Sequence, residues 1–177
     1  MASRTAPTAT KVIMRTAKGV AATALLLLAA VAVFAPSASA RAKDAHRAMV
    51  EKHGSQVMPF RMNKTMHVFR TTADGGIETV VAKSVTDQAD IALIREHLRK
   101  ESLRFQAGDF SDPAYIHGSA MPGLAQLHAG AKQIAIQYAQ LPAGASIRFK
   151  ARDPKLVSAI HRWFAAQLHD HGPDARD

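Results

Sequence analysis

The chain has 177 residues, with 23 Lys and Arg against 14 Asp and Glu, nine histidines and no cysteine. Without cysteine there can be no disulfide framework, no thiolate metal site, no iron–sulfur cluster and no cysteine nucleophile. The length is typical of a single domain, because domains usually contain roughly 100–200 residues.

The first 40 residues have the features of an export signal. Four basic residues and no acidic one accompany an apolar run over residues 19–35, and the small residues from Ala38 to Ala40 match a signal-peptidase site. We therefore expect residues 1–40 to be a signal peptide removed after Ala40, and the mature protein to be periplasmic or secreted, without membrane contact. An uncleaved anchor helix stays open, although about 20 apolar residues are needed to span a bilayer.

The basic character of the chain belongs partly to this leader. The leader holds four of the 23 basic residues and none of the acidic ones, so residues 41–177 keep a net charge of +5. Their basic residues are scattered rather than gathered in a stripe with aromatic residues, which argues against nucleic-acid binding. All nine histidines stay in the mature part, and a functional hypothesis must explain this excess.

Local patterns in the first half of the mature chain predict a helix, a hairpin and a second helix. Residues 41–53 have helical composition and stop at Gly54, a residue typical of helix C-termini. Residues 65–83 alternate in polarity on either side of an Asp-Gly-Gly turn at 74–76. Residues 87–105 carry apolar side chains at helical spacing, which predicts a long amphipathic helix.

The second half repeats this order after a connector rich in glycine and proline, which allows a short helix at 124–129. Residues 134–149 again alternate around a turn, and Asp153 followed by Pro154 marks the start of a helix. We therefore predict an α+β fold for one domain, residues 41–177. Two ββα repeats (64–105 and 132–171, joined by the connector 106–131) form a four-stranded antiparallel sheet with two long helices on one face, plus an N-terminal helix.

His67 in the first hairpin is a candidate metal ligand. It matches the core-facing Ile136 when the two halves are overlaid, so its side chain is expected to face the core. It follows Met66 in a stretch rich in methionine and histidine, residues 58–67, and thioether with imidazole suits Cu(I). Two alternatives stay open: a buried histidine with one hydrogen-bond partner, and methionines that fill core gaps.

The end of the last helix holds a second candidate set. His161 and His169 flank one stripe of this helix, and His169, Asp170 and His171 place two imidazoles and a carboxylate side by side. These ligand types suit Zn(II) or Cu(II). The alternative is a solvated helix C-terminus, where protonatable side chains favour the helix dipole.

The connector is the third candidate region. It carries His117 and Met121 between two rigid units, where binding residues tend to concentrate. Of the other histidines, His46 and His53 share a helix face too far apart to hold one ion, and His97 lies on the rim of the first long helix. No serine-hydrolase, P-loop or dinucleotide motif is present, so an enzyme is not favoured, and an active site in residues 106–123 stays open.

Several segments are similar to a family of small exported bacterial proteins whose members are often labelled "aspartate carbamoyltransferase". They are Ile94 to Leu98, Gly108 to Phe110, Ile116 to Gly118, Met121 to Leu124, Ala159 to Phe164 and Asp170 to Gly172. The resemblance implies a small exported protein and assigns no activity to particular residues. The label itself has no support in this sequence, because such an enzyme has two α/β domains and a Ser-Thr-Arg-Thr phosphate loop, whose nearest counterpart, Ser3 to Thr5, lies in the leader.

The sequence therefore favours an exported, histidine-rich, non-catalytic protein that binds a metal ion or other small ligand, copper before zinc. Haem held by the same histidines is a variant of this hypothesis. The alternative is an envelope protein-binding or pH-responsive module with structural histidines, since histidine titrates near pH 6.5. An unrecognised enzyme is a further alternative, and carbamoyltransferase activity is not favoured.

Overall fold

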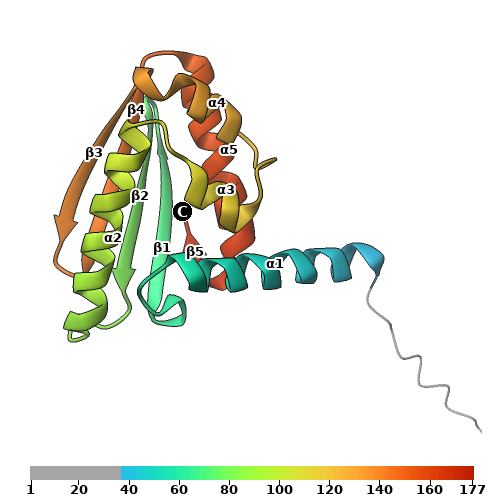
Figure 1. Ribbon diagram of the computed structural model, residues 1–177, viewed down its shortest axis with the longest axis vertical. Helices are drawn as coiled ribbons and strands as arrows, with labels where there is room; N and C mark the ends of the chain where they lie inside the picture. The colour runs from blue at the N-terminus through green and yellow to red at the C-terminus, as the bar shows by residue number, and fades with distance from the viewer. Residues whose placement is uncertain (1–36) are drawn as a thin grey trace, which may run out of the picture. The chain divides into compact units, whose positions relative to one another are not determined.

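The computed structural model describes residues 37–177 (Figure 1). The expected signal peptide lies outside the described residues, apart from its last four. The last three of these begin helix α1 (Ala38–Val57), and Ser37 caps the helix by accepting a hydrogen bond from the Ala40 amide. Across residues 37–177, no helix combines the length and hydropathy needed to cross a membrane.

Five strands form one mixed sheet in the order β3-β4-β2-β1-β5. Antiparallel hairpins are formed by β1 (Thr65–Thr72) with β2 (Gly75–Ala82) and by β3 (Ile134–Leu141) with β4 (Gly144–Ala151), and β2 pairs antiparallel with β4. The fifth strand, β5 (Ala175–Arg176), runs parallel to β1. The fold is thus α+β, but the prediction of a four-stranded, wholly antiparallel sheet is wrong. A strand of two residues is too short to show an alternating pattern.

The first hairpin turns at Ala73 and Asp74, so the two glycines of the predicted Asp-Gly-Gly turn are the first residues of β2. Gly75 has φ +148°, and a Cβ on it would stand 2.1 Å from the carbonyl oxygen of Phe149 on β4. A Cβ on Gly76 would stand 2.4 Å from the ring of Phe164. The two glycines therefore let β4 and the last helix approach the hairpin closely.

Two further long helices, α2 (Gln88–Gln106) and α5 (Pro154–His171), both begin after an aspartate. Asp87 accepts a hydrogen bond from the Asp90 amide, and Asp153 accepts one from the Lys155 amide at 2.8 Å. These contacts satisfy backbone donors that a helix start leaves unpaired. Both helices begin within one residue of the predicted position.

Helices α2 and α5 pack on the same face of the sheet, and the core lies between these helices and the sheet. The ring of Phe149 on β4 lies 5.7 Å from Phe105 of α2 and 5.3 Å from Trp163 of α5, centroid to centroid. All three side chains are at most 3% exposed. Side chains on this face of the sheet are therefore enclosed by the helical layer.

Shorter elements close the ends of this core. The connector contains α3 (Ser111–His117), which the sequence did not predict, and α4 (Leu124–Gly130), which agrees with the predicted short helix. Helix α1 continues through Gly54 instead of ending there, because Gly54 is a packing site: a Cβ on it would stand 2.8 Å from Met62 Sδ. The 3-10 turns are η1 (Met62–Lys64), η2 (Ala131–Gln133) and η3 (Gly172–Asp174).

Candidate functional site

Three histidines from separate parts of the chain meet beneath α1, and we call His67, His117 and His171 the histidine cluster. His67 comes from β1, His117 is the last residue of α3, and His171 is the last residue of α5. The rings of His67 and His171 stack with centroids 4.8 Å apart and planes at 8°, and the His117 ring meets His171 edge-on at 5.1 Å. The fold therefore joins all three candidate regions of the sequence.

His67 is the most deeply enclosed member of the cluster. It is 3% exposed, and neither ring nitrogen has a hydrogen-bond partner among the described residues. Burial lowers its pKa well below the usual value, and the nearby charges of His171, His97 and His117 lower it further. Its imidazole is therefore neutral at physiological pH, with one lone pair free for a ligand.

Two further imidazoles, the half-buried His171 and the buried His97, have depressed pKa values. Burial lowers the pKa of His171 to about 4, with a contribution from His117, while Asp170 and Asp174 oppose the shift. Burial also lowers the pKa of His97 on α2 to about 4. Near pH 7 these side chains add no positive charge to the interior, so imidazoles can lie close together without mutual repulsion.

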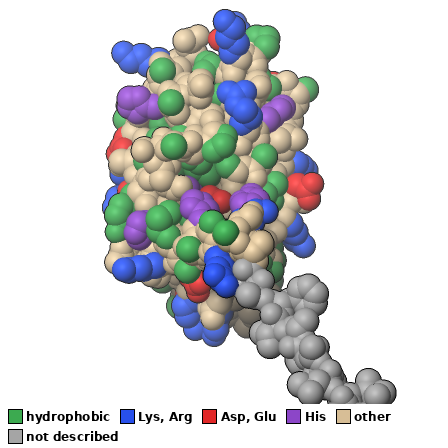
Figure 2. All heavy atoms as spheres, turned by 90° about the vertical axis from the view of Figure 1, so that its right-hand side faces the viewer, with side chains coloured by type: hydrophobic (Ala, Val, Ile, Leu, Met, Phe, Trp, Pro, Cys, Tyr) green, Lys and Arg blue, Asp and Glu red, His purple; other side chains and the backbone are tan. Residues whose placement is uncertain are grey.

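Asp170 on α5 is the hub of a polar network beside the cluster. Its carboxylate accepts a hydrogen bond from His117 Nδ1 at 2.9 Å and one from His169 Nδ1 at 3.2 Å, and His46 Nε2 lies 3.1 Å away. Although burial opposes ionisation, hydrogen bonds from His117, His169 and His46 hold the pKa of Asp170 well below its usual range. In the space-filling view of Figure 2, histidine side chains lie beside an acidic one on the face turned toward the viewer. The bond from Nδ1 leaves Nε2 of His117 as its lone-pair nitrogen.

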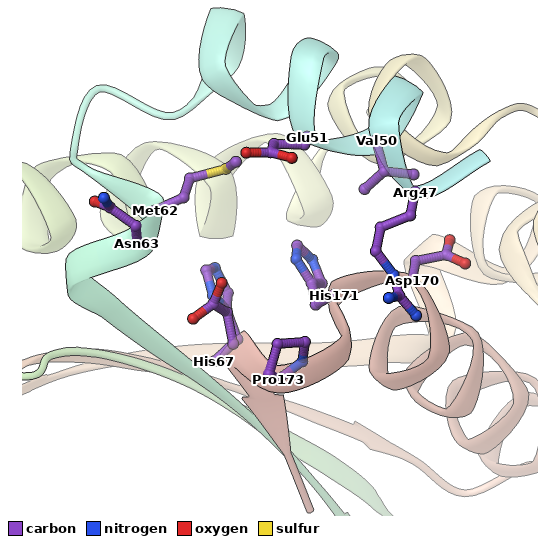
Figure 3. A pocket seen from close by; sticks show the side chains of 10 residues that line it. Arg47, Val50, Glu51, Met62, Asn63, His67, Asp170, His171 and Pro173 are labelled. Atoms are coloured by element: carbon purple, nitrogen blue, oxygen red, sulfur yellow. The ribbon is translucent and has the colours of Figure 1, made fainter. Parts of the chain in front are cut away.

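A pocket of about 240 Å³ opens next to His67 and His171. Figure 3 shows both imidazoles on one side of the hollow, with Met62 and Glu51 across from them. Glu51 belongs to α1, and Met62 belongs to the turn before β1. The pocket thus brings together two imidazoles, a thioether and the carboxylates of Glu51, Asp170 and Asp174, which are all metal-ligand types.

The side chains are close, but they are not arranged as a finished metal site. Within residues 37–177, no three histidine, aspartate or glutamate side chains have the spacing of a metal centre. The lone pairs of the stacked His67 and His171 rings lie in parallel planes. Two side chains that bind the same metal ion must instead both direct a lone pair at that ion. A metal held by His67 and His171 would therefore require one ring to rotate.

The structure brings together five of the eight side chains that the sequence singled out: His67, His117, His169, Asp170 and His171. His161 lies elsewhere, because its Nε2 donates to the carbonyl oxygens of Thr72 and Gly75 at the hairpin turn. Met66 is adjacent to His67 in a strand, so it points to the opposite face of the sheet. Met121 packs in the hydrophobic core. The structure therefore does not bring these three side chains of the predicted ligand set into the histidine cluster.

Four ligand-type residues near the site were not among the predicted ligands: His46, Glu51, Met62 and His97. Met62 lies in the stretch rich in methionine and histidine, and strand alternation would have excluded Met66, leaving Met62 before the strand as the better candidate. The contact between His46 and Asp170 depends on how α1 docks, for which the sequence carries no signal.

Comparison of the chain with known protein families, curated proteins and solved structures finds no match. Function is therefore argued from the geometry of the site.

Proposed function

We propose that this protein binds a transition-metal ion, copper before zinc, in the pocket formed by His67, His171 and Met62. The observation that carries the proposal is the buried imidazole of His67, which has no partner for either nitrogen. An unsatisfied buried polar group costs about 1–3 kcal/mol, so it favours any ligand that engages it. A metal ion would engage the lone-pair nitrogen.

The chemistry of the lining side chains favours copper. Metal binding needs neutral imidazole, and burial keeps His67 and His171 neutral because it lowers both pKa values. Imidazole and thioether together suit Cu(I), whereas thiolate, the usual alternative for soft metals, does not occur in the chain. Asp170 supports the arrangement because it orients His117 as a carboxylate orients a ligating histidine.

The size of the pocket argues against haem, the other cofactor that the histidines suggest. Pockets for drug-sized molecules have volumes of about 300–1,000 Å³. The pocket beside His67 measures about 240 Å³ and is narrowed by Arg47 and Val50 of α1. A bare ion fits this volume better than a porphyrin does.

Titration of the purified protein, prepared without a histidine tag, with Cu(I), Cu(II) and Zn(II) tests the proposal. We expect one Cu(I) ion per chain with a Kd below about 10 µM. His171→Gln and Met62→Leu should each weaken binding at least tenfold. His128→Gln, the same change at an exposed histidine of α4, should leave the affinity unchanged.

Two results would overturn the metal proposal. The first is a Kd for every one of these ions weaker than about 10 µM. The second is binding that His171→Gln and Met62→Leu leave intact, because the ion would then be held elsewhere. Circular dichroism of each variant separates a lost ligand from a lost fold.

A second candidate function, a pH-responsive module, is favoured by one specific observation. His67 and His97 are buried and His171 is half-buried, and the pKa of each is lowered. Acidification therefore forces protons onto imidazoles that the folded state holds neutral, and the cluster is where the structure would open. In this function the partner would be another protein of the envelope.

We also infer that the protein is periplasmic or secreted and that its two hairpin-plus-helix units arose by duplication. The leader supports export. Supporting duplication, each unit consists of a 3-10 turn, two strands of eight residues and a long helix that follows an aspartate.

A further inference from the structure

A second cavity lies in the interior, under α3, and it is distinct from the pocket beside His67. Its volume is about 30 Å³. A single water needs about 10–15 Å³ by this measure, so the cavity has room for a molecule of about three heavy atoms. Among its lining side chains are Glu78 of β2, Glu101 of α2, Asp112 and His117 of α3, and Trp163 and Gln167 of α5.

Two hydrogen-bond donors of the cavity wall have no partner among the described residues. They are Nε1 of Trp163 and Nε2 of Gln167, in side chains only 1% and 5% exposed. Trp163 and Gln167 are four residues apart on α5, so they lie on the same helix face. A buried donor without an acceptor is costly, and one carbonyl oxygen with two lone pairs could serve both.

Carboxyl groups line the cavity as well. Burial and the charge of Glu101 raise the pKa of Glu78 to about 8. Burial and the charge of Asp112 raise the pKa of Glu101 to about 7, although Arg104, 3.1 Å away, opposes the shift. These groups offer oxygen acceptors for a ligand that carries N–H donors.

We propose that this cavity binds a small neutral molecule with a primary amide group. The carbonyl oxygen would accept from Trp163 and Gln167, and the amide nitrogen would donate to the carboxyl groups of Glu78 and Glu101. An anion of the same size would face the carboxyl groups, and a cation would face two N–H donors with Arg104 nearby. A neutral group that has both an acceptor and two donors can pair with the two N–H donors and with the carboxyl groups at once.

Three planar probes of three heavy atoms each test the charge and the class of the ligand: formamide is neutral, formate is an anion and formamidinium is a cation. Trp163 is the only tryptophan in the chain, so its indole N–H gives one resolved signal in a proton–nitrogen NMR spectrum. We expect formamide to shift this signal saturably, with a Kd of about 1–20 mM, which is reasonable for so few atoms. Formate and formamidinium should cause no saturable shift.

Paired variants check that the site is the cavity. Gln167→Leu removes one donor at similar volume and should weaken formamide binding at least fivefold. Gln137→Leu makes the same change at an exposed position of β3 and should leave binding unchanged. The proposal is overturned if formamide gives no saturable shift up to about 50 mM, if the three probes act alike, or if Gln167→Leu binds formamide like the unmodified protein.

The amide proposal and the metal proposal can be refuted independently. Formamide binding is measured without metal, and Gln167 does not line the pocket beside His67. A negative metal titration therefore leaves the amide proposal standing, and a negative formamide titration leaves the metal proposal standing.

Discussion

Replacing Glu78 by glutamine should stabilise the protein at neutral and alkaline pH and have little effect near pH 4.5. The pKa of Glu78 is raised from 4.5 to about 8 in the folded protein, first by burial and then by the charge of Glu101. Between these two values the unfolded chain carries the ionised carboxylate while the folded chain must keep it protonated. The stability that the neutral carboxyl permits is therefore fully present below pH 4.5 and is lost as the pH rises toward 8.

The magnitude follows from the width of this window. At pH 7.5 the unfolded carboxylate lies about 3 pH units above its own pKa, and each unit is equivalent to 1.36 kcal/mol, which gives about 4 kcal/mol. Water that reaches the cavity screens part of the charge, so we expect Glu78→Gln to gain about 2–4 kcal/mol at pH 7.5. The groups that face this carboxyl are Glu101, Asp112 and His117, and all three remain in the variant.

Urea unfolding at pH 5 and pH 7.5, followed by the fluorescence of Trp163, measures the effect. Glu96→Gln, an exposed glutamate on α2, is the matched control and should show no pH-dependent gain. The reasoning is refuted if Glu78→Gln changes the free energy of unfolding equally at both pH values, because Glu78 would then titrate normally in the folded state.

Three further predictions concern other parts of the structure. His171→Gln should reduce the loss of stability between pH 6.5 and pH 4 by up to about 3 kcal/mol, because the lowered pKa of His171 in the folded state makes stability fall with acidification. Thermal unfolding across that pH range measures the effect, and an unchanged pH profile would contradict the lowered pKa. Asp170→Asn should lower the free energy of unfolding by about 2 kcal/mol at pH 7, measured with urea, because it weakens charge-assisted hydrogen bonds. A loss below about 0.5 kcal/mol would mean that the network is not formed in solution. Gly123→Ala should destabilise the protein by at least about 3 kcal/mol, because φ of Gly123 is +86° and the new Cβ would stand 2.2 Å from the carbonyl oxygen of Ala159. Gly118→Ala, where φ is +95° but the space is open, should cost only about 1–2 kcal/mol in backbone strain. Equal losses of stability in the two variants would argue against the packing at Gly123.

The elements set by local chemistry could be predicted from the sequence. Asp87 and Asp153 cap their helices where the pattern indicates, and the first hairpin turns at Ala73 and Asp74, within one residue of the predicted turn. Features that depend on tertiary packing could not be predicted. Gly54 has the composition of a helix end but serves to admit Met62, and β5 exists only because η3 returns the chain to the edge of β1.

The same division holds for the candidate site. Chemical type was sufficient to single out His67, His117 and the histidines at the end of α5, because the chain is rich in histidine and lacks cysteine. Their convergence depends on the position of α3, a helix that the glycine- and proline-rich connector concealed. The carboxyl groups of Glu78 and Glu101 carried no signal in sequence, since one lies on a strand and the other on a helix, and only the packing of the two layers makes them face one cavity.

The short strand β5 gives the pocket a mechanical connection to the edge of the sheet. In the ladder, Ala175 lies opposite His67, and only η3 separates β5 from His171 at the end of α5. Rotation of either imidazole to meet an ion would therefore affect the pairing of β1 with β5. The amide protons of β1 and β5 should therefore exchange with solvent at a rate that depends on whether the pocket holds a ligand. Hydrogen exchange at this edge of the sheet would then report binding in the pocket.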